Sequence, residues 1–420
     1  MKKIKNDPST NNKGYNRRFF IKSAGIGIGA GILGCKGSVV AQQVIQGFED
    51  TGNKLTSPKI WTPFSDRKLR VGLVGYGVCQ FAAAFGFQDH PNVEVVAVSD
   101  LFPDRCAKLA EVTKCNKTYP SLEELVKDSS IEAVFVATDA PSHARHCLDV
   151  LNHGKHCASA VPAIWGSDQL EDAEKLFETV KRTGLKYMMF ETSAFHDGLY
   201  AMREIYKAGG FGKLIYSEGE YYHYMPEPLP SYKDWRVGLP PQWYSTHANA
   251  YYICVNNGSF TEVSCIGHRS SIEQFQPENN VYRNPFGSAT ALYKTSEGGM
   301  ARMNIFWDNA GIGAEAGRIS GEKGSFWNTR SGFSGLPESM ELVKTLNLKK
   351  PPLPPGVEPG YHEGSHGPLC HEFIMSILEN RKPYVNIAMA LNISVAGVIA
   401  HQSALNDGEL MKIPQYKYWD

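Results

Sequence analysis

Residues 68–100, KLRVGLVGYGVCQFAAAFGFQDHPNVEVVAVSD, contain the turn that decides the fold of this chain. The apolar run Val71–Val74 predicts a strand, and Gly75 and Gly77 follow it closely. Glycine suits this turn because it adopts positive φ and lets a pyrophosphate approach bare backbone. A helix is predicted after Gly77, and its N-terminal amides would point at the phosphates. The pattern indicates a dinucleotide site with Gly75, Gly77 and Val78 among its contacts.

An acid closes the second strand of this unit. Asp100 stands where a carboxylate can accept hydrogen bonds from both ribose hydroxyls. Leu101 and Phe102 follow it, and no basic residue adjoins it before Arg105, so a 2′-phosphate would meet like charge. Gln80 replaces the third glycine of the G-x-G-x-x-G pattern. We predict bound NAD rather than NADP.

Beyond Asp100 the alternation of strands and helices continues. Ile131–Thr138 is a continuous apolar run, typical of a parallel sheet covered on both faces. From Leu214 onward, segments alternate on a two-residue period between glycine-rich turns, which indicates antiparallel strands. The predicted fold is α/β, with an N-terminal Rossmann dinucleotide-binding domain over residues 68–190. A C-terminal α+β domain with an open, mostly antiparallel sheet is predicted over residues 191–420.

The N-terminal sequence matches an export signal. The pair Arg17-Arg18, followed by Phe and then Lys, precedes the mildly apolar stretch Ser23–Gly34, as in a twin-arginine signal. The stretch is too short to cross a bilayer as a helix. We expect residues 1–41 to be the signal, residues 42–67 to be a linker, and the protein to be exported to the periplasm.

Two cleavage outcomes remain open. Ile32–Cys35 resembles a lipobox, which would leave a lipid anchor on Cys35, whereas Val39–Ala41 resembles an ordinary cleavage site. Either outcome delivers a folded protein to a compartment where nicotinamide cofactors are scarce. We therefore expect the NAD to be loaded before export, tightly held and recycled in place.

Composition excludes several classes of partner and site. The formal net charge is zero and no basic stripe is present, so no nucleic-acid partner is expected. The nine cysteines are scattered and contain no C-x-x-C pair, which argues against a disulfide framework. The histidines show no ligand spacing such as H-E-x-x-H, so no metal site is predicted.

Three further motifs carry a family resemblance. Ala137–His143 is similar to an A-T-P-x-x-x-H strand end, and Gly154–His156 followed by Pro162 is similar to G-K-H-V-x-x-E-K-P. Arg318–Gly324 is similar to R-I-x-G-T-K-G. With the glycine turn, these motifs resemble the Gfo/Idh/MocA oxidoreductase family, including its glucose–fructose oxidoreductase-like and NAD-dependent glycosidase-like members. The resemblance implies an NAD(P)-dependent oxidoreductase, with Thr138, His143 and Pro162 at the cofactor.

One departure from the family pattern affects the chemistry. Where the family has E-K-P, this chain reads Ala160-Val161-Pro162. The family lysine usually helps to move the substrate hydroxyl proton during hydride transfer, and Val161 cannot. Either the chain is an inactive homologue, or its acid–base groups come from elsewhere. We favour the second interpretation.

The candidate acid–base groups lie in three places. His247 falls where the family places its catalytic histidine, and imidazole titrates near working pH. Tyr222 and His223 stand on a predicted strand whose alternation puts them on opposite faces. Glu191 ends a strand at the carboxyl edge of the sheet, where ligands bind, so it is a candidate contact to ribose or substrate. We expect His247 to carry the proton step, with Tyr222 or His223 as a relay.

The density of tyrosine and tryptophan in the second half of the chain suits a pyranose substrate, because flat aromatic faces with polar tips stack on sugar rings. The leading hypothesis is oxidation of a ring hydroxyl of a sugar or glycoside to a keto-sugar, with C3 as the expected position. The second is a glycosidase that uses transient oxidation and elimination, and the third is a non-catalytic homologue. Homo-oligomers through the open sheet are also expected.

Overall fold

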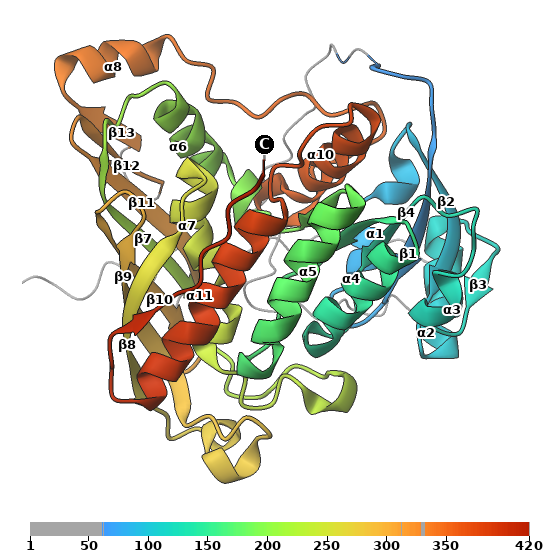
Figure 1. Cartoon of the computed structure of the whole chain (residues 1–420), viewed down its shortest axis with the longest axis horizontal. Helices are drawn as coiled ribbons and strands as arrows, with labels where there is room; N and C mark the ends of the chain where they lie inside the picture. The colour runs from blue at the N-terminus through green and yellow to red at the C-terminus, as the bar shows by residue number, and fades with distance from the viewer. Residues whose placement is uncertain (1–60, 62, 312, 329–331, 420) are drawn as a thin grey trace, which may run out of the picture. The chain divides into compact units, whose positions relative to one another are not determined.

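The computed structural model of the chain describes residues 61, 63–311, 313–328 and 332–419. The predicted signal over residues 1–41, including Cys35, lies outside the described residues, as does most of the predicted linker. The described strands form two sheets, named A and B here (Figure 1). The α/β fold with two unlike sheets is therefore confirmed.

Sheet A has six strands in the order β3-β2-β1-β4-β5-β6, and every neighbouring pair is parallel. The strand order changes direction between β1 and β4, and such a switch point leaves a crevice at the carboxyl ends of the strands. The Rossmann arrangement is confirmed. The strands are β1 (Leu69–Val74), β2 (Val93–Ser99), β3 (Thr118–Tyr119), β4 (Ala133–Val136), β5 (His156–Ser159) and β6 (Tyr187–Met189).

The helix predicted directly after Gly77 is much shorter than a standard Rossmann helix. It begins only at Phe81 and ends at Ala84, and Gln80 enters it in the left-handed conformation with φ of 52°. Helix α3 is equally short, and the other helices of this half have 10 to 14 residues. The α-helices of this half are α1 (Phe81–Ala84), α2 (Pro103–Thr113), α3 (Leu122–Leu125), α4 (His143–Asn152), α5 (Leu170–Thr183) and α6 (Asp197–Lys207).

Sheet B has eight strands in the order β13-β12-β11-β7-β10-β9-β8-β14. Only the β7–β10 pair is parallel among its neighbours, so the mostly antiparallel sheet is confirmed. The strands are β7 (Leu214–Tyr222), β8 (Phe260–Arg269), β9 (Phe286–Thr295), β10 (Met300–Phe306), β11 (Ala314–Gly321), β12 (Gly324–Trp327), β13 (Gly332–Gly335) and β14 (Met411–Lys412).

Helices cover one face of sheet B. In Figure 1, α6, α7 and α11 lie on the same side of this sheet, and within the described residues no helix covers the other side. A Cβ at Gly219 of β7 would lie 2.1 Å from the carbonyl oxygen of Ala248, so α7 rests directly on the strand. The later helices are α7 (Thr246–Asn256), α8 (Pro337–Lys344), α9 (Tyr361–Gly364), α10 (His366–Leu378) and α11 (Ile387–Leu405).

A single hydrophobic cluster runs from the strands of sheet A to the helices under sheet B. Phe87 stacks on Phe190 with ring centroids 5.8 Å apart, and it also contacts Phe373 of α10. Helix α11 is apolar and long enough to cross a membrane, but 94% of its most apolar window is buried inside the protein, as in a core helix. The shared core holds the carboxyl edge of sheet A close to α7, which positions the site.

Candidate functional site

A cleft of about 630 Å³ opens at the carboxyl edge of sheet A, at the switch point between β1 and β4. Most of the predicted cofactor contacts line this cleft: Gly75, Gly77, Val78, Asp100, Thr138 and His143. Pro162 and Glu191 do not line it. A cavity therefore lies where the strand order predicts a crevice, and most of the predicted cofactor contacts line it.

The glycine turn leaves room for a ligand to approach the backbone. Gly75 has φ of +97°, and a Cβ there would lie 2.2 Å from the carbonyl oxygen of Ala137. A Cβ at Gly77 would meet no atom within 4 Å, so this part of the turn faces the open cleft. The turn thus forms a cradle of bare backbone of the kind that a pyrophosphate requires.

Asp100 has a structural role in addition to the predicted one. Its Oδ2 accepts a hydrogen bond of 2.6 Å from the amide of Tyr76, and its Oδ1 accepts one of 2.9 Å from the amide of Phe102. The carboxylate therefore fixes the glycine turn to the end of β2. An ionised carboxylate has about four lone-pair sites, so Asp100 can still accept from ribose hydroxyls. The cradle and this acid together fit NAD.

The wall opposite the glycine turn is apolar where the family has a lysine. Ala160 and Val161 both line the cleft. Behind them, Nδ1 of His143 lies 2.9 Å from the carbonyl oxygen of Pro162, and its Nε2 lies 3.1 Å from that of Thr138. Burial lowers the pKa of His143, so the ring is neutral and donates to only one of the two carbonyls. His143 and Pro162 fix the wall rather than supply an acid–base group.

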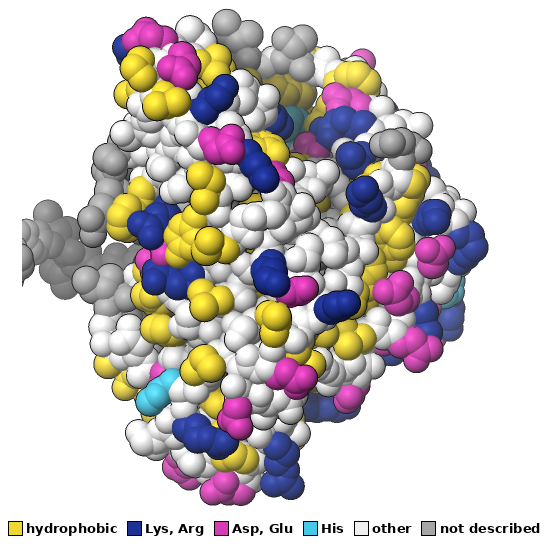
Figure 2. Space-filling view, turned by 60° about the vertical axis from the view of Figure 1, so that its left-hand side comes forward, with side chains coloured by type: hydrophobic (Ala, Val, Ile, Leu, Met, Phe, Trp, Pro, Cys, Tyr) yellow, Lys and Arg dark blue, Asp and Glu magenta, His cyan; other side chains and the backbone are white. Residues whose placement is uncertain are grey.

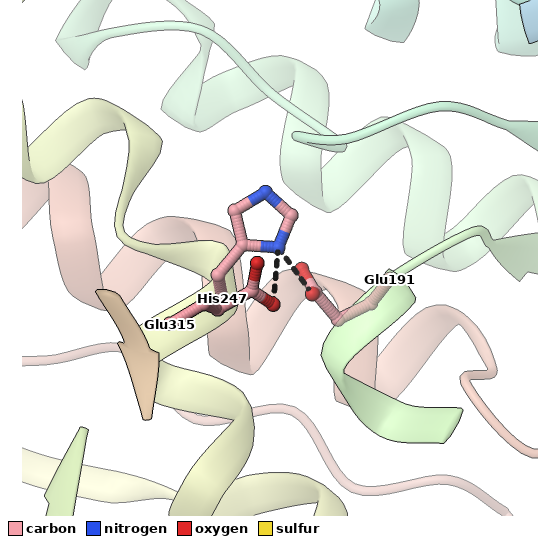
Figure 3. A group of neighbouring side chains, drawn as sticks. All are labelled: Glu191, His247 and Glu315. Carbon is pink, nitrogen blue, oxygen red and sulfur yellow. Dashed lines mark hydrogen bonds and ion pairs between the residues drawn. The ribbon is translucent and has the colours of Figure 1, made fainter. Parts of the chain in front are cut away.

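A buried cluster of acid and base lies deeper in the protein (Figure 3). Nδ1 of His247, in the first turn of α7, is 2.7 Å from Oε1 of Glu191 and 3.6 Å from Oε1 of Glu315. Glu191 follows β6, and its Oε1 also accepts a hydrogen bond of 3.1 Å from the amide of Ser193. Glu315 stands on β11 directly opposite Tyr221 of β7. Three elements therefore deliver one imidazole and two carboxylates to the same place.

The two carboxylates control the charge of His247. Burial alone would lower the pKa of this imidazole, but the negative charges of Glu191 and Glu315 outweigh burial and raise the pKa to about 9. Burial raises the pKa of Glu191, yet the charge of His247 and its hydrogen bond more than compensate, so the pKa of Glu191 is lowered. The pair is therefore an imidazolium and a carboxylate at neutral pH.

The orientation of the ring leaves its second nitrogen available. Figure 3 shows Nε2 of His247 pointing away from both carboxylates. The ring of Tyr221 lies 4.7 Å from that of His247, and the ring of Tyr244 lies 5.8 Å from it. Tyr244 lines the large cleft, and both tyrosines line a smaller cavity that shares Arg236 with it. His247 thus lies directly behind the aromatic wall of the cleft.

The same cluster could be considered as a metal site, which the sequence does not predict. The donor atoms of Glu191, His247 and Glu315 lie within 4.8 Å of one another. However, the 2.7 Å contact between Nδ1 and Oε1 is already a charge-assisted hydrogen bond. The proton of the imidazolium occupies the position between the carboxylates that a cation would take. The arrangement holds the Nδ1 proton of His247 against Glu191.

Comparison with known proteins agrees with this geometry. Residues 69–191 match a family described as an oxidoreductase family with an NAD-binding Rossmann fold. The nucleotide domain belongs to the Gfo/Idh/MocA oxidoreductase family. A Glycosyl hydrolase family 109 protein of Bacteroides fragilis is 29% identical over 230 residues, which cover 50% of this chain and 47% of that protein. The match thus spans about half the length of that relative.

Two further proteins match along most of the chain. A Glycosyl hydrolase family 109 protein of Solibacter usitatus is 24% identical over 445 aligned positions, covering 96% of this chain and 97% of that protein. The WlbA dehydrogenase of Bordetella pertussis, solved in complex with NADH and UDP-GlcNAcA, has a TM-score of 0.64 at 16% identity. That likeness covers 84% of this chain and 99% of the other, and it shows the fold.

The predicted relay residues do not share one location. Tyr222 stacks on Phe306 and receives a hydrogen bond from Asn304. Strand alternation puts Tyr222 on the face opposite to that of Gly219, against which α7 rests. The body of the sheet therefore separates Tyr222 from His247, and a relay through Tyr222 is not supported. His223 lies on the covered side, 6.0 Å from Tyr221 between ring centroids, and lines the smaller cavity. Glu191 contacts His247 and does not line the cleft, and its contact to ribose or substrate stays a prediction.

Sequence reasoning missed the partners that complete the site. Tyr221 is next to Tyr222 in the sequence, but its contact with His247 depends on where α7 packs. Glu315 lies far from Tyr221 in sequence and reaches it only through the β11–β7 register. Arg236 and Tyr244 come from a segment without clear periodicity. An alternating strand that pairs with β7 was the only signal that could have indicated Glu315.

Proposed function

We propose that this protein is an NAD-dependent oxidoreductase that removes hydride from a ring carbon of a sugar or glycoside, at C3 as the expected position. The observation that carries the proposal is the buried Glu191–His247 pair, with a 2.7 Å contact, directly behind the wall of a cavity fit for NAD. A histidine held in one tautomer by a carboxylate is a standard general acid–base arrangement. Val161 leaves the lysine position of the family without a proton carrier.

The proton chemistry follows from the orientation of His247. When bound, NAD supplies the hydride acceptor. Nε2 of His247 takes the hydroxyl proton as the hydride leaves, while Nδ1 keeps its hydrogen bond to Glu191. The ring must be neutral to accept a proton at Nε2, and its pKa is about 9. Oxidation should therefore accelerate as the pH rises toward about 9, and the imidazolium should favour the reverse reduction.

Aromatic and polar groups near the cavities suit a sugar ring. Trp235, Tyr244 and Arg236 line the large cleft. Their flat faces and polar edges can stack on a pyranose and bond its hydroxyls. The WlbA dehydrogenase, which shares the fold, was solved with NADH and a nucleotide sugar.

The test is turnover of a panel of glycosides by the holoprotein as purified, with products identified by mass spectrometry. A keto-sugar formed in proportion to reduced cofactor or to an added acceptor supports the oxidoreductase. If no glycoside or free sugar reduces the bound cofactor, the proposal fails. That outcome would favour the non-catalytic homologue that the loss of the family lysine suggests.

A glycosidase is the second candidate, and the names of the relatives favour it. In this reaction, transient oxidation acidifies the neighbouring C–H bond, elimination expels the aglycone, and the same cofactor returns its hydride. No external oxidant is needed, which suits a protein that cannot exchange its NAD. The product assay separates the two candidates, because a glycosidase releases aglycone without net reduction of cofactor.

Location and assembly are part of the same proposal. Arg17-Arg18 supports export of the folded holoprotein to the periplasm, with a lipid anchor if Cys35 is the mature N-terminus. The uncovered face of sheet B supports pairing with a second copy. Ile266 and Leu292 are exposed there, and Figure 2 shows hydrophobic side chains in small groups among charged ones. Light scattering should report an oligomer that Leu292→Glu disrupts, and a monomeric wild-type protein would refute the pairing.

A further inference from the structure

A second buried histidine lies between two carboxylates next to the site. His196 precedes α6, and its side chain is almost completely buried. Its Nε2 lies 3.5 Å from Oε1 of Glu315, and its Nδ1 lies 3.7 Å from Oε2 of Glu363. The two ring nitrogens therefore face two different carboxylates. Neither contact is a hydrogen bond at these distances, so small side-chain movements make and break each one.

The inner carboxylate connects this histidine to His247. The same Oε1 of Glu315 lies 3.6 Å from Nδ1 of His247, and the Oγ of Ser193 donates a hydrogen bond to it. Glu315 therefore touches both histidines with one oxygen atom. The side chains follow one another in the order His247, Glu315, His196 and Glu363, and both histidines are buried.

The outer carboxylate reaches solvent. The side chain of Glu363 is 42% exposed, whereas that of Glu315 is 14% exposed. Nζ of Lys350 fixes the backbone around it, because it donates hydrogen bonds to the carbonyl oxygens of Phe195, Glu363 and Gly364. This anchor ties the Glu363 segment to the residue just before His196. The hydrogen bonds from the Lys350 side chain to these backbone carbonyls thus keep His196 and Glu363 close together.

We propose that Glu315, His196 and Glu363 form a proton relay between His247 and solvent. The proposal rests on the proposed function, because oxidation of an alcohol sends a hydride to NAD and leaves one proton on Nε2 of His247. The Nδ1 proton then passes to Glu315, which hands a proton to Nε2 of His196. Nδ1 of His196 releases its proton to Glu363, and Glu363 releases it to water. One proton enters at Nε2 of His247 and one leaves from Glu363, so the passage balances. Each histidine then carries its proton on Nε2, and that proton must return to Nδ1 before the next passage.

Other titratable groups lie close to the relay. His362 and His366 on α9 and α10 are close enough that His196 lowers the pKa of both, although burial is the larger cause. Asp197 pairs with Lys350 at 3.0 Å on the exposed side. None of these groups interrupts the path from His247 to Glu363. A purely structural ion-pair cluster would share the geometry but would not move protons.

Proton exchange at His247 tests the relay without a substrate. In the NAD-loaded holoprotein, the Nδ1 proton shared with Glu191 should give a downfield proton resonance, assigned by its loss in His247→Gln. Saturation transfer from water measures its exchange rate. Glu363→Gln and His196→Asn should each slow this exchange by at least about tenfold. Asp197→Asn, which removes a neighbouring exposed carboxylate, should leave it unchanged. Equal exchange rates in wild type and Glu363→Gln would overturn the proposal.

Buffer rescue gives the second readout. With the glycoside that reduces the bound cofactor fastest, Glu363→Gln should turn over more slowly than wild type, and added imidazole buffer should restore the rate saturably. A structural role for Glu363 would not respond to buffer. Slow turnover that imidazole does not restore would refute the relay while leaving the oxidoreductase intact. If no sugar is oxidised, the proposed function fails, and the exchange measurement still decides whether the path conducts protons.

Discussion

Replacing Glu191 by Gln should remove the main cause of the raised pKa of His247. The rise in the pKa of His247 from 6.5 to about 9 amounts to about 3 kcal/mol of preference for the protonated ring. Glu191 is the nearer carboxylate, at 2.7 Å against 3.6 Å for Glu315, so it contributes the larger share. In Glu191→Gln the pKa of His247 should fall by at least about one unit, because burial is then opposed by one carboxylate alone.

The assay is an NMR titration of His247 in the holoprotein, together with the pH dependence of cofactor reduction in a single turnover. Glu315→Gln is the matched control, and its titration midpoint should fall by less. Both rate profiles should shift to lower pH with the midpoint of His247. A midpoint in Glu191→Gln that stays near 9 would refute the assignment of this carboxylate as the main cause of the raised pKa.

The raised pKa of His247 should also make the free energy of unfolding depend on pH. A histidine whose pKa is about 9 in the folded state and near 6.5 in the unfolded chain stabilises the fold fully below pH 6.5. This contribution is lost as the pH rises through about 9. Chemical denaturation of the wild-type protein should therefore show a fall of up to about 3 kcal/mol in the free energy of unfolding over this range. Glu191→Gln should show a clearly smaller fall.

Three further predictions concern the cofactor and export. Gly75→Ala should lose bound NAD and unfold at lower temperature, since its Cβ would lie 2.2 Å from the Ala137 carbonyl oxygen at a φ of +97°; normal NAD content after gel filtration would contradict the cradle. Denaturing the purified wild-type protein should release NAD(H), since Asp100 disfavours a 2′-phosphate; release of NADP(H) would overturn this. Replacing Arg17 and Arg18 by Lys should leave full-length, NAD-loaded protein in the cytoplasm, and unchanged export would exclude the twin-arginine signal.

The sequence predicted the fold well because the local patterns and the packing agree. The continuous apolar run at β4 reflects burial on both faces, and the alternation along β7 correctly put Tyr222 and His223 on opposite faces. The helix after Gly77 was the exception. Four apolar or small residues after Gln80 look helical, but Gly86 at φ of 75° ends the segment almost at once.

The site was only partly predictable because it depends on contacts between distant segments. The resemblance indicated His247, but nothing local distinguishes Tyr222 from Tyr221 as its neighbour until α7 is placed on the sheet. Glu315 reaches the site only because β11 pairs with β7 in the register that places it opposite Tyr221. Glu191 follows a strand of sheet A, and its buried contact with the imidazole depends on where α7 packs, which no local pattern indicates.

Single-turnover reduction of the bound NAD by a glycoside tests the central claim most directly. If His247 is the base that replaces the family lysine, cofactor reduction in His247→Ala should slow by about two to four orders of magnitude. The variant should be less stable than wild type, because Glu191 is left buried without its partner, but it should keep its NAD, whose cleft His247 does not line. Tyr222→Phe, on the other face of sheet B, should reduce the cofactor at the wild-type rate. A wild-type rate in His247→Ala would contradict the account. If wild type does not reduce its cofactor and Val161→Lys alone creates activity, the chain is an inactive homologue.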